Sequence, residues 1–429
     1  MKKLIKKIID NKYFLLNLLS KALNALCVFM ISLIVIKFYG SSGLGDLATY
    51  QSLVGLIQPI FLFGLGGYII KKSPIGNNDP DGFYINVYIT FLLCSIIVFF
   101  IFKLMVFLLK DYFLTYSKFF DFFILGAISS AFILVCQSAF VVNQRYILLA
   151  LSNFFPKFIL LFVLIYLNYF NNHLIITAYQ LDFISSVLVS FIFSLLFLII
   201  FFRRIKIKSL FFFSKEFWSN NYNFVLIGLI HTFNSCFGVI VSFYFSSSND
   251  VGELALALRF IAPIVLILSV VNNFTARDFR ECYDNGGAKK VILRSSQITT
   301  KYFIYFIIAI ISIVILVYPM IIIMDIKLSI FWRCFFVLIF GYIINVYYLA
   351  SGNVLIICGD VKAERVILSI SLVLNLIFVF STINFLGVLS VAVGQALAMI
   401  IVNLLTDIYV RIKYKTSISP KFKSEFVCL

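Results

Sequence analysis

The stretch that decides the fold runs from Tyr39 to Lys72 and reads YGSSGLGDLATYQSLVGLIQPIFLFGLGGYIIKK. A turn rich in glycine and serine leads into an apolar run of helix length, which ends in two lysines. Gln51 and Gln58 stand seven residues apart inside this run, so a helix places them on one face. Pro59 removes a backbone hydrogen bond beside them, and we expect a kink there.

The same pattern returns about half a chain later, in the segment SSSNDVGELALALRFIAPIVLILSVVNNFTARDF between Ser246 and Phe279. The tetrapeptide GDLA at 45–48 reappears there as GELA at 252–255, and the apolar run again carries a proline, Pro263. A match at this separation predicts an internal duplication of the chain.

The composition is that of a membrane protein. Of the 429 residues, 62% are hydrophobic and only 12% are charged, and the mean hydropathy is +1.08. A soluble domain carries about twice that share of charge. Apolar runs of roughly 20 residues recur along the chain, and each can span a bilayer as a helix. Barrel strands would alternate apolar and polar residues, which these runs do not. The sequence therefore predicts an all-α polytopic membrane protein.

Twelve spans are expected, and the quoted stretch and its repeat form the second and the eighth. They lie at about 14–36, 47–70, 83–109, 118–141, 148–168, 174–202, 220–245, 254–274, 302–324, 329–351, 363–385 and 388–410.

Lysine and arginine alternate between dense and sparse loops along these spans. The dense segments are the two chain ends and the loops after spans 2, 4, 6, 8 and 10, with Lys157, soon after Arg145, counted toward the loop after span 4. Because cytoplasmic loops are enriched in Lys and Arg, both termini are predicted to be cytoplasmic. The same rule accounts for the net charge of +17. No basic soluble module is present, so we expect no nucleic-acid binding.

The basic segment Arg203–Lys215 is the longest linker near mid-chain, and it separates two predicted six-helix lobes, 1–208 and 209–429. An even number of spans in each lobe gives both lobes the same orientation in the membrane. The lobes are therefore expected to be a parallel repeat about an axis along the membrane normal.

Ionisable groups at membrane depth are costly and tend to face a cavity. The clearest are Lys21 in span 1, Asp182 in span 6, His231 in span 7 and Arg259 in span 8. Arg259 stands four residues before the proline of its span.

Other polar residues share helix faces with these groups at three- and four-residue spacings. Span 1 adds Asn17 and Asn24, span 2 has Gln51 and Gln58, and span 7 adds Asn234. If the lobes are related by a twofold axis, spans 1 and 7 correspond, as do spans 2 and 8. Four polar faces would then line one central cleft.

Each of these residues also has a plainer interpretation. Lys21 and Arg259 can extend to the nearest lipid headgroups. Gln51 and Gln58 can hold helices together. His231 is either a packed histidine or a proton-coupling group, and Asp182 is either an ion-coupling residue or the partner of a neighbouring helix.

Signatures of catalysis or metal binding are missing. The eight cysteines show no metal-binding spacing, and we expect neither a disulfide nor a metal site. The sequence has no GxxxxGK[ST] phosphate loop, no HExxH and no GxSxG. The outer loops are short, so we expect no enzymatic domain and no cofactor, apart from a candidate coupling ion.

This pattern resembles the polysaccharide-transport branch of the multidrug/oligosaccharidyl-lipid/polysaccharide (MOP) exporter superfamily, and in particular the O-antigen flippases of the Wzx type. The resemblance rests on about twelve spans in two parallel sixes, on the GLGDLATYQSLVGLIQPIFLFGLGGYIIKK segment and on its copy at span 8. It implies two MATE-like lobes in a V shape around a central cavity lined by helices 1, 2, 7 and 8.

The resemblance also implies a substrate and a location. Flippases of this type carry an undecaprenyl-pyrophosphate-linked oligosaccharide across the bacterial inner membrane, alongside other membrane proteins of polysaccharide assembly. Lys21 and Arg259 would attract the pyrophosphate, and Gln51, Gln58, Asn24 and Asn234 would bind sugar hydroxyls. His231 would lie in the same path.

Two other functions stay open. A multidrug exporter of the MATE type, driven by H⁺ or Na⁺, would use Asp182 or His231 to carry the coupling ion. A membrane polymerase or ligase of lipid-linked glycans would need a large outer loop, and the sequence has none.

Overall fold

In the computed structural model the chain is built from helices. The structure describes residues 2–72, 82–108, 116–143, 145–170, 176–201, 215–323, 329–349 and 351–420, and these ranges contain helices and no strand. The helices are α1 (Lys2–Leu62), α2 (Leu65–Lys72), α3 (Phe83–Leu108), α4 (Phe120–Val142), α5 (Tyr146–Phe170), α6 (Ala178–Phe201), α7 (Lys215–Phe245), α8 (Ser248–Ile323), α9 (Ser329–Tyr347), α10 (Ser351–Ile357), α11 (Val361–Leu386) and α12 (Leu389–Tyr414).

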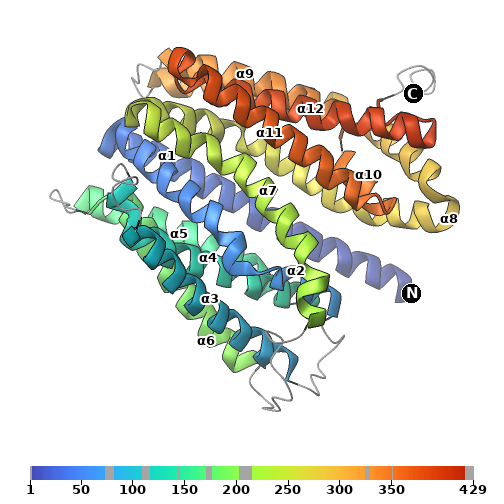
Figure 1. The fold of residues 1–429 in the computed structure, drawn as a ribbon, viewed down its shortest axis with the longest axis horizontal. Coiled ribbons are helices and arrows are strands. Elements are labelled where there is room, and N and C mark those ends of the chain that lie inside the picture. Colours follow the sequence, from blue (N-terminus) through green and yellow to red (C-terminus); the bar gives the residue numbers. More distant parts are fainter. Residues whose placement is uncertain are drawn as a thin grey trace. The chain divides into compact units, whose positions relative to one another are not determined.

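Two of these helices are broken at glycine and contain two spans each. Gly40 interrupts α1 with φ 72° and ψ 179°, and the two segments of α1 run antiparallel in Figure 1. Gly286 and Gly287 interrupt α8, and Gly287 has φ 66°. A positive φ is strained for residues with a side chain, so glycine at positions 40 and 287 permits these breaks.

The predicted number of spans agrees with these helices. Eleven stretches in the described part are long and apolar enough to cross a membrane. The first, Leu19–Leu62, has 44 residues and contains the break at Gly40, so it supplies two spans. The chain is therefore a multi-pass membrane protein of the predicted helical class. Pro59 lies inside α1, and within the described range Lys2–Leu62 the only non-helical interior residue is Gly40, so the kink predicted there is not marked at the proline itself. The helix ends at Leu62, and Phe63 and Gly64 adopt positive φ before α2 begins.

The chain divides into two compact units, residues 1–240 (unit 1) and 241–429 (unit 2). Most of α7 belongs to unit 1 in this division. The lobe boundary predicted at 208/209 lies in a segment outside the described residues and stays a prediction.

Contacts at the helix ends of unit 1 follow the predicted alternation of loops. At one end, Lys118 Nζ, just before α4, lies 2.7 Å from Asp46 Oδ1, after the break in α1. At the other end, Asn143, just after α4, donates its amide to the Tyr84 hydroxyl at the start of α3, at 2.5 Å. The Tyr84 ring stacks on Phe201 at the end of α6, with centroids 4.3 Å apart. When successive helices alternate in direction, the starts of spans 2 and 4 lie at one end of the unit, and the start of span 3 lies at the other end with the ends of spans 4 and 6.

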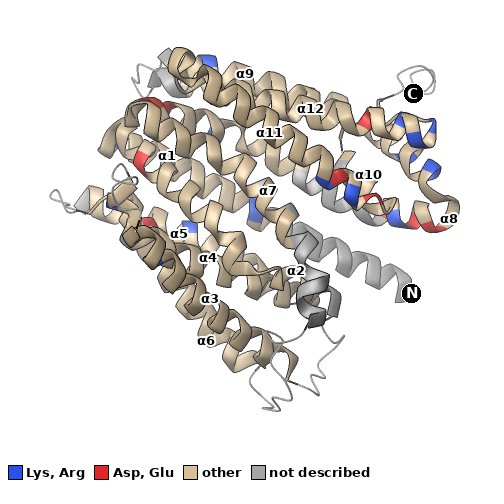
Figure 2. Cartoon of the chain, in the orientation of Figure 1, with Lys and Arg blue, Asp and Glu red and all other residues tan. Residues whose placement is uncertain are grey.

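Unit 2 shows the same grouping of helix ends. Glu253, near the start of α8, accepts a hydrogen bond from the Ile330 N–H at the start of α9, at 2.9 Å. Ser296, after the break in α8, donates to the Ser419 carbonyl beyond α12, at 2.8 Å. Figure 2 shows Lys, Arg, Asp and Glu mostly near helix ends in each unit, with long tan stretches between them. Which end faces the cytoplasm stays a prediction.

Small residues allow some helices to approach closely, as is common in membranes. On α9, a methyl group added to Gly341 would lie 2.8 Å from Ala396 Cα on α12. On α4, one added to Gly126 would overlap the hydroxyl of Tyr50, which is buried on the second segment of α1.

Candidate functional site

A buried carboxylate, Asp182, is the centre of the main polar cluster in unit 1. It lies near the start of α6 and is 3% exposed. Lys157 Nζ on α5 lies 2.6 Å from Asp182 Oδ1. Gln51 Nε2, on the second segment of α1, donates to Asp182 Oδ2 at 2.9 Å. Both oxygens of the buried acid therefore have a donor, as the high cost of burying a charge requires.

Lys157 is a membrane-depth charge that the sequence interpretation misplaced. The charge pattern of the sequence assigns it to the basic loop after span 4, but the structure places it eleven residues into the 25-residue helix α5. At 1.5 Å rise per residue it lies roughly 16 Å from the start of the helix. The signal that could have identified it is a lysine, directly after Pro156, in the middle of an apolar helix that has the length of one span.

The two partners of this ion pair differ in their access to solvent. The Lys157 side chain is 24% exposed, whereas that of Asp182 is 4% exposed. The carboxylate is therefore buried, while part of the lysine side chain is exposed.

The cluster continues toward the first segment of α1. One turn before Lys157, Asn153 donates its side-chain amide to the hydroxyl of Ser20, at 3.2 Å. Ser20 is buried, and its neighbour Lys21 is half-buried. One turn further, Asn24 has a buried Oδ1 that accepts no hydrogen bond from the described residues. The polar row predicted on span 1 therefore adjoins the helix that carries Lys157.

The remaining predicted residues are spread over both units. Gln58 is half-buried on α1, and Asn234 is half-buried on α7. The side chain of His231 lies outside the described residues. Arg259 is half-buried on α8 in unit 2. The ring of its neighbour Phe260 packs against the ring of Phe331 on α9, with ring centroids 5.6 Å apart. The structure thus brings Gln51 and Asp182 into contact, and the meeting of four polar faces in one cleft stays a prediction.

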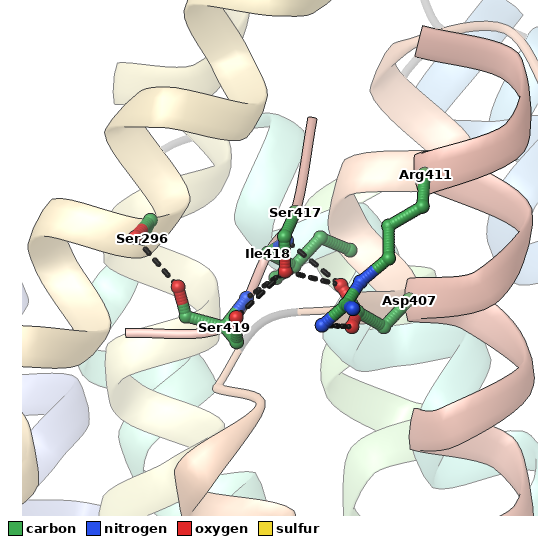
Figure 3. A network of polar contacts seen from close by, with 6 residues as sticks. All are labelled: Ser296, Asp407, Arg411, Ser417, Ile418 and Ser419. Atoms are coloured by element: carbon green, nitrogen blue, oxygen red, sulfur yellow. Dashed lines mark hydrogen bonds and ion pairs between the residues drawn. The ribbon is translucent and has the colours of Figure 1, made fainter. Parts of the chain in front are cut away.

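A second polar network, shown in Figure 3, lies in unit 2, where the chain leaves α12. Asp407, buried on α12, accepts hydrogen bonds from the Ser417 hydroxyl at 2.8 Å and the Ile418 N–H at 2.9 Å. Arg411 lies 2.7 Å from its other oxygen. Ile418 is fully buried, and Ser419 is bound to Ser296 of α8. The segment after α12 is thereby fixed against two helices.

Neighbouring contacts attach the start of α11 to the end of α12. Asp360 binds the Lys413 ammonium and accepts a hydrogen bond from the Tyr414 hydroxyl at 2.6 Å. Burial alone would raise the pKa of Asp360, but the bonds from Lys413 and Tyr414 outweigh it and hold that pKa below its ordinary value. Burial, together with the charge of Asp360, raises the pKa of the Cys358 thiol to about 11. These contacts join helix ends.

Within the described ranges, no three His, Cys, Asp or Glu residues gather where they could hold a metal ion. The cysteines described there carry free thiols.

Comparison with known proteins gives structural matches only. No protein-family profile matches the chain, and no curated protein matches it. Among solved structures, the MATE multidrug transporter DinF-BH superposes with a TM-score of 0.66 at 12% identity, covering 94% of this chain and 95% of its own. An inward-facing multidrug resistance MATE transporter of the MOP superfamily gives 0.58 at 13% identity, covering 94% of each chain.

A third solved structure, a MOP superfamily transporter from Pyrococcus furiosus described as having a binding pocket of reverse polarity, gives a TM-score of 0.60 at 12% identity, covering 94% of this chain and 96% of its own. These matches extend over nearly the whole chain. The fold is therefore that of the MATE and MOP transporters, in agreement with the superfamily that the sequence resembles.

Proposed function

We propose that this protein is a flippase that moves an undecaprenyl-pyrophosphate-linked oligosaccharide across the bacterial inner membrane by alternating access. The fold it shares with MATE and MOP transporters supports the transporter class. The choice of an anionic lipid-linked substrate rests on the charges at membrane depth.

The observation that carries the proposal is that both acidic side chains described in unit 1 are already neutralised. Asp46 is bound to Lys118, and Asp182 is bound to Lys157 and Gln51. A cationic drug would need a carboxylate to offset the hydration it loses in the membrane, and neither of these is free. An anionic head group is better matched, because the charges that the described helices hold at membrane depth are predominantly cations.

Three such cations are Lys21 and Lys157 in unit 1 and Arg259 in unit 2. A pyrophosphate that leaves the headgroup layer loses hydration, and a nearby cation offsets part of that loss. Gln51, Gln58, Asn24 and Asn234 would supply hydrogen bonds to sugar hydroxyls. In this proposal the prenyl tail stays in lipid while the head group crosses. Dispersed contacts of this kind bind weakly enough to permit release.

The proposal includes the setting that the resemblance implies. The protein lies in the inner membrane with both termini in the cytoplasm. It works without an organic cofactor and beside other proteins of polysaccharide assembly. Coupling to H⁺ or Na⁺ through Asp182 or His231 is part of the alternative function.

That alternative is a cation-coupled small-molecule exporter. It is favoured by the likeness to DinF-BH, a MATE multidrug transporter, at a TM-score of 0.66. The Pyrococcus furiosus protein, with its reverse-polarity pocket, shares the fold at 0.60. A binding pocket of reversed polarity thus occurs on the same fold, and in this proposal the charge of the site favours the flippase.

Deletion of the gene in its host separates the two functions. A flippase predicts loss of surface polysaccharide and accumulation of lipid-linked oligosaccharide in the cytoplasmic leaflet, with unchanged drug susceptibility. An exporter predicts increased drug susceptibility with normal surface polysaccharide. Expression of the gene from a plasmid must reverse the defect in either case.

A further inference from the structure

We propose that Lys157 binds the phosphate of the transported head group and that Asp182 is a built-in competitor that keeps this binding weak. The inference rests on the proposed function and specifies its site. It assigns Lys157 a direct contact with substrate and makes Asp182 a positioning residue that acts through Lys157.

The first argument is the difference in exposure within the ion pair. The Lys157 side chain is 24% exposed, whereas the Asp182 side chain is 4% exposed, so a solute has access to the lysine side chain and not to the carboxylate. The ammonium has three N–H donors, and the hydrogen bond to Asp182 Oδ1 at 2.6 Å uses one of them. A phosphate oxygen can therefore approach Lys157 from the open side while Asp182 holds it from the closed side.

The second argument is the fixed position of the carboxylate. Gln51 donates to Asp182 Oδ2, and the Asp182 backbone carbonyl accepts from the Ser185 hydroxyl at 2.9 Å. Gln51 thus holds the Asp182 carboxylate beside Lys157. A fixed negative charge on one side of the ammonium weakens the attraction of a second anion on the other side. Substrate can then bind and still be released.

This arrangement predicts a dependence between two substitutions that a structural ion pair would not show. Asp182→Asn removes the competing charge and leaves the lysine in place, so binding of a phosphate anion tightens. Lys157→Gln removes the binding group, so binding weakens. In the double variant, binding stays as weak as in Lys157→Gln, and the tightening caused by Asp182→Asn is lost. The reason is that Asp182 acts only through Lys157.

The test is an isothermal titration of inorganic pyrophosphate into the purified full-length protein in nanodiscs of phosphatidylcholine. Calorimetry measures the Kd of pyrophosphate. We expect Asp182→Asn to lower Kd about tenfold and Lys157→Gln to raise it about tenfold. We expect the double variant to match Lys157→Gln. The double variant keeps an amide pair at the same site, so it should elute as a monodisperse protein even if a single variant folds poorly.

The second ion pair of unit 1 supplies the matched control. Asp46 and Lys118 also lie 2.7 Å apart, but at a helix end where Lys118 is 41% exposed. Asp46→Asn and Lys118→Gln should leave Kd unchanged. Equal changes at both pairs would show a general charge effect and overturn the inference.

Two further outcomes would also overturn it. Wild-type affinity in the double variant would exclude Lys157 as the binding group. Loss of pyrophosphate binding when phosphatidylglycerol is added to the nanodiscs would show that Lys157 holds a phospholipid headgroup instead. Neither outcome bears on the proposed function, which the deletion experiment tests separately.

Discussion

Asp46 and Glu253 stand at the same position of the repeated tetrapeptide, and each carboxylate binds the start of the helix that lies two spans further along. Asp46 Oδ1 accepts from Lys118 just before α4, at 2.7 Å. Glu253 Oε2 accepts from the backbone N–H groups of Ile330 and Phe331 at the start of α9, at 2.9 Å each. The duplication predicted from the sequence is therefore accompanied by a common tertiary contact. Its chemistry differs, with a side-chain cation in unit 1 and a helix N-terminus in unit 2.

The two anchors should differ in strength. Glu253→Ala leaves two N–H groups at the start of α9 without their acceptor, which costs about 1–3 kcal/mol. Asp46→Ala removes an ion pair with a 41% exposed lysine, which costs at most about 1 kcal/mol. Thermal unfolding of the purified variants in detergent should show the larger drop for Glu253→Ala. The reverse order would contradict this comparison.

Close packing between α9 and α12 makes Gly341 intolerant of a side chain. The added methyl group of Gly341→Ala would meet the backbone of Ala396 at 2.8 Å. Overpacking of this kind costs about 1–3 kcal/mol. Gly228→Ala on α7 is the control, because nothing lies within 4 Å of its added methyl group. We expect a lower melting temperature for the first variant and no loss for the second. Equal melting temperatures would show that α9 and α12 are further apart.

The segment after α12 should be released when Asp407 is removed. Asp407→Ala takes away the acceptor of Ser417 and of the Ile418 N–H. Limited trypsin digestion should then cleave after Lys415 at least about tenfold faster, since each lost hydrogen bond is worth about 1 kcal/mol. Arg411→Ala removes the ion pair between an exposed arginine and the buried Asp407 but leaves the hydrogen bonds of Asp407 to Ser417 and Ile418 in place, and should change the rate little. Identical digestion of Asp407→Ala and wild type would contradict the docked position of this segment.

Much of the fold can be predicted from the sequence, because a bilayer imposes length and hydrophobicity on each span. The twelve spans follow from that constraint. Asp182 is conspicuous because a lone acid in an apolar span is rare. The sequence does not identify its partner Lys157, because the ion pair joins two different helices. In a chain with many basic residues, this lysine also resembles a loop charge. Docking of the segment after α12 is missed as well, since it depends on burial of Ile418, a tertiary contact with no local pattern.

The two cations chosen from the sequence carry their own prediction. We expect Lys21→Gln and Arg259→Gln each to lower surface polysaccharide severalfold at normal protein levels, because each removes a charge that offsets lost phosphate hydration. Arg259→Lys should keep partial activity, since a lysine lacks the two-point contact of a guanidinium with phosphate. Arg259→Glu should be worse than Arg259→Gln, because it repels the anion. If both side chains only reach toward lipid headgroups, the glutamine variants will transport normally, which quantitative surface-polysaccharide assays would show.

The most direct test of the central claim is transport by the purified protein in proteoliposomes. A synthetic prenyl-pyrophosphate disaccharide is placed in both leaflets, and the fraction accessible to a membrane-impermeant oxidant is followed over time. The proposed function predicts that wild-type protein exposes the inner-leaflet pool, that Lys157→Gln slows this markedly, and that Lys118→Gln, the control from the exposed ion pair, does not. An inner-leaflet pool that stays protected with wild-type protein, in vesicles where the same protein moves a cationic dye, would contradict the proposed function and establish the exporter instead.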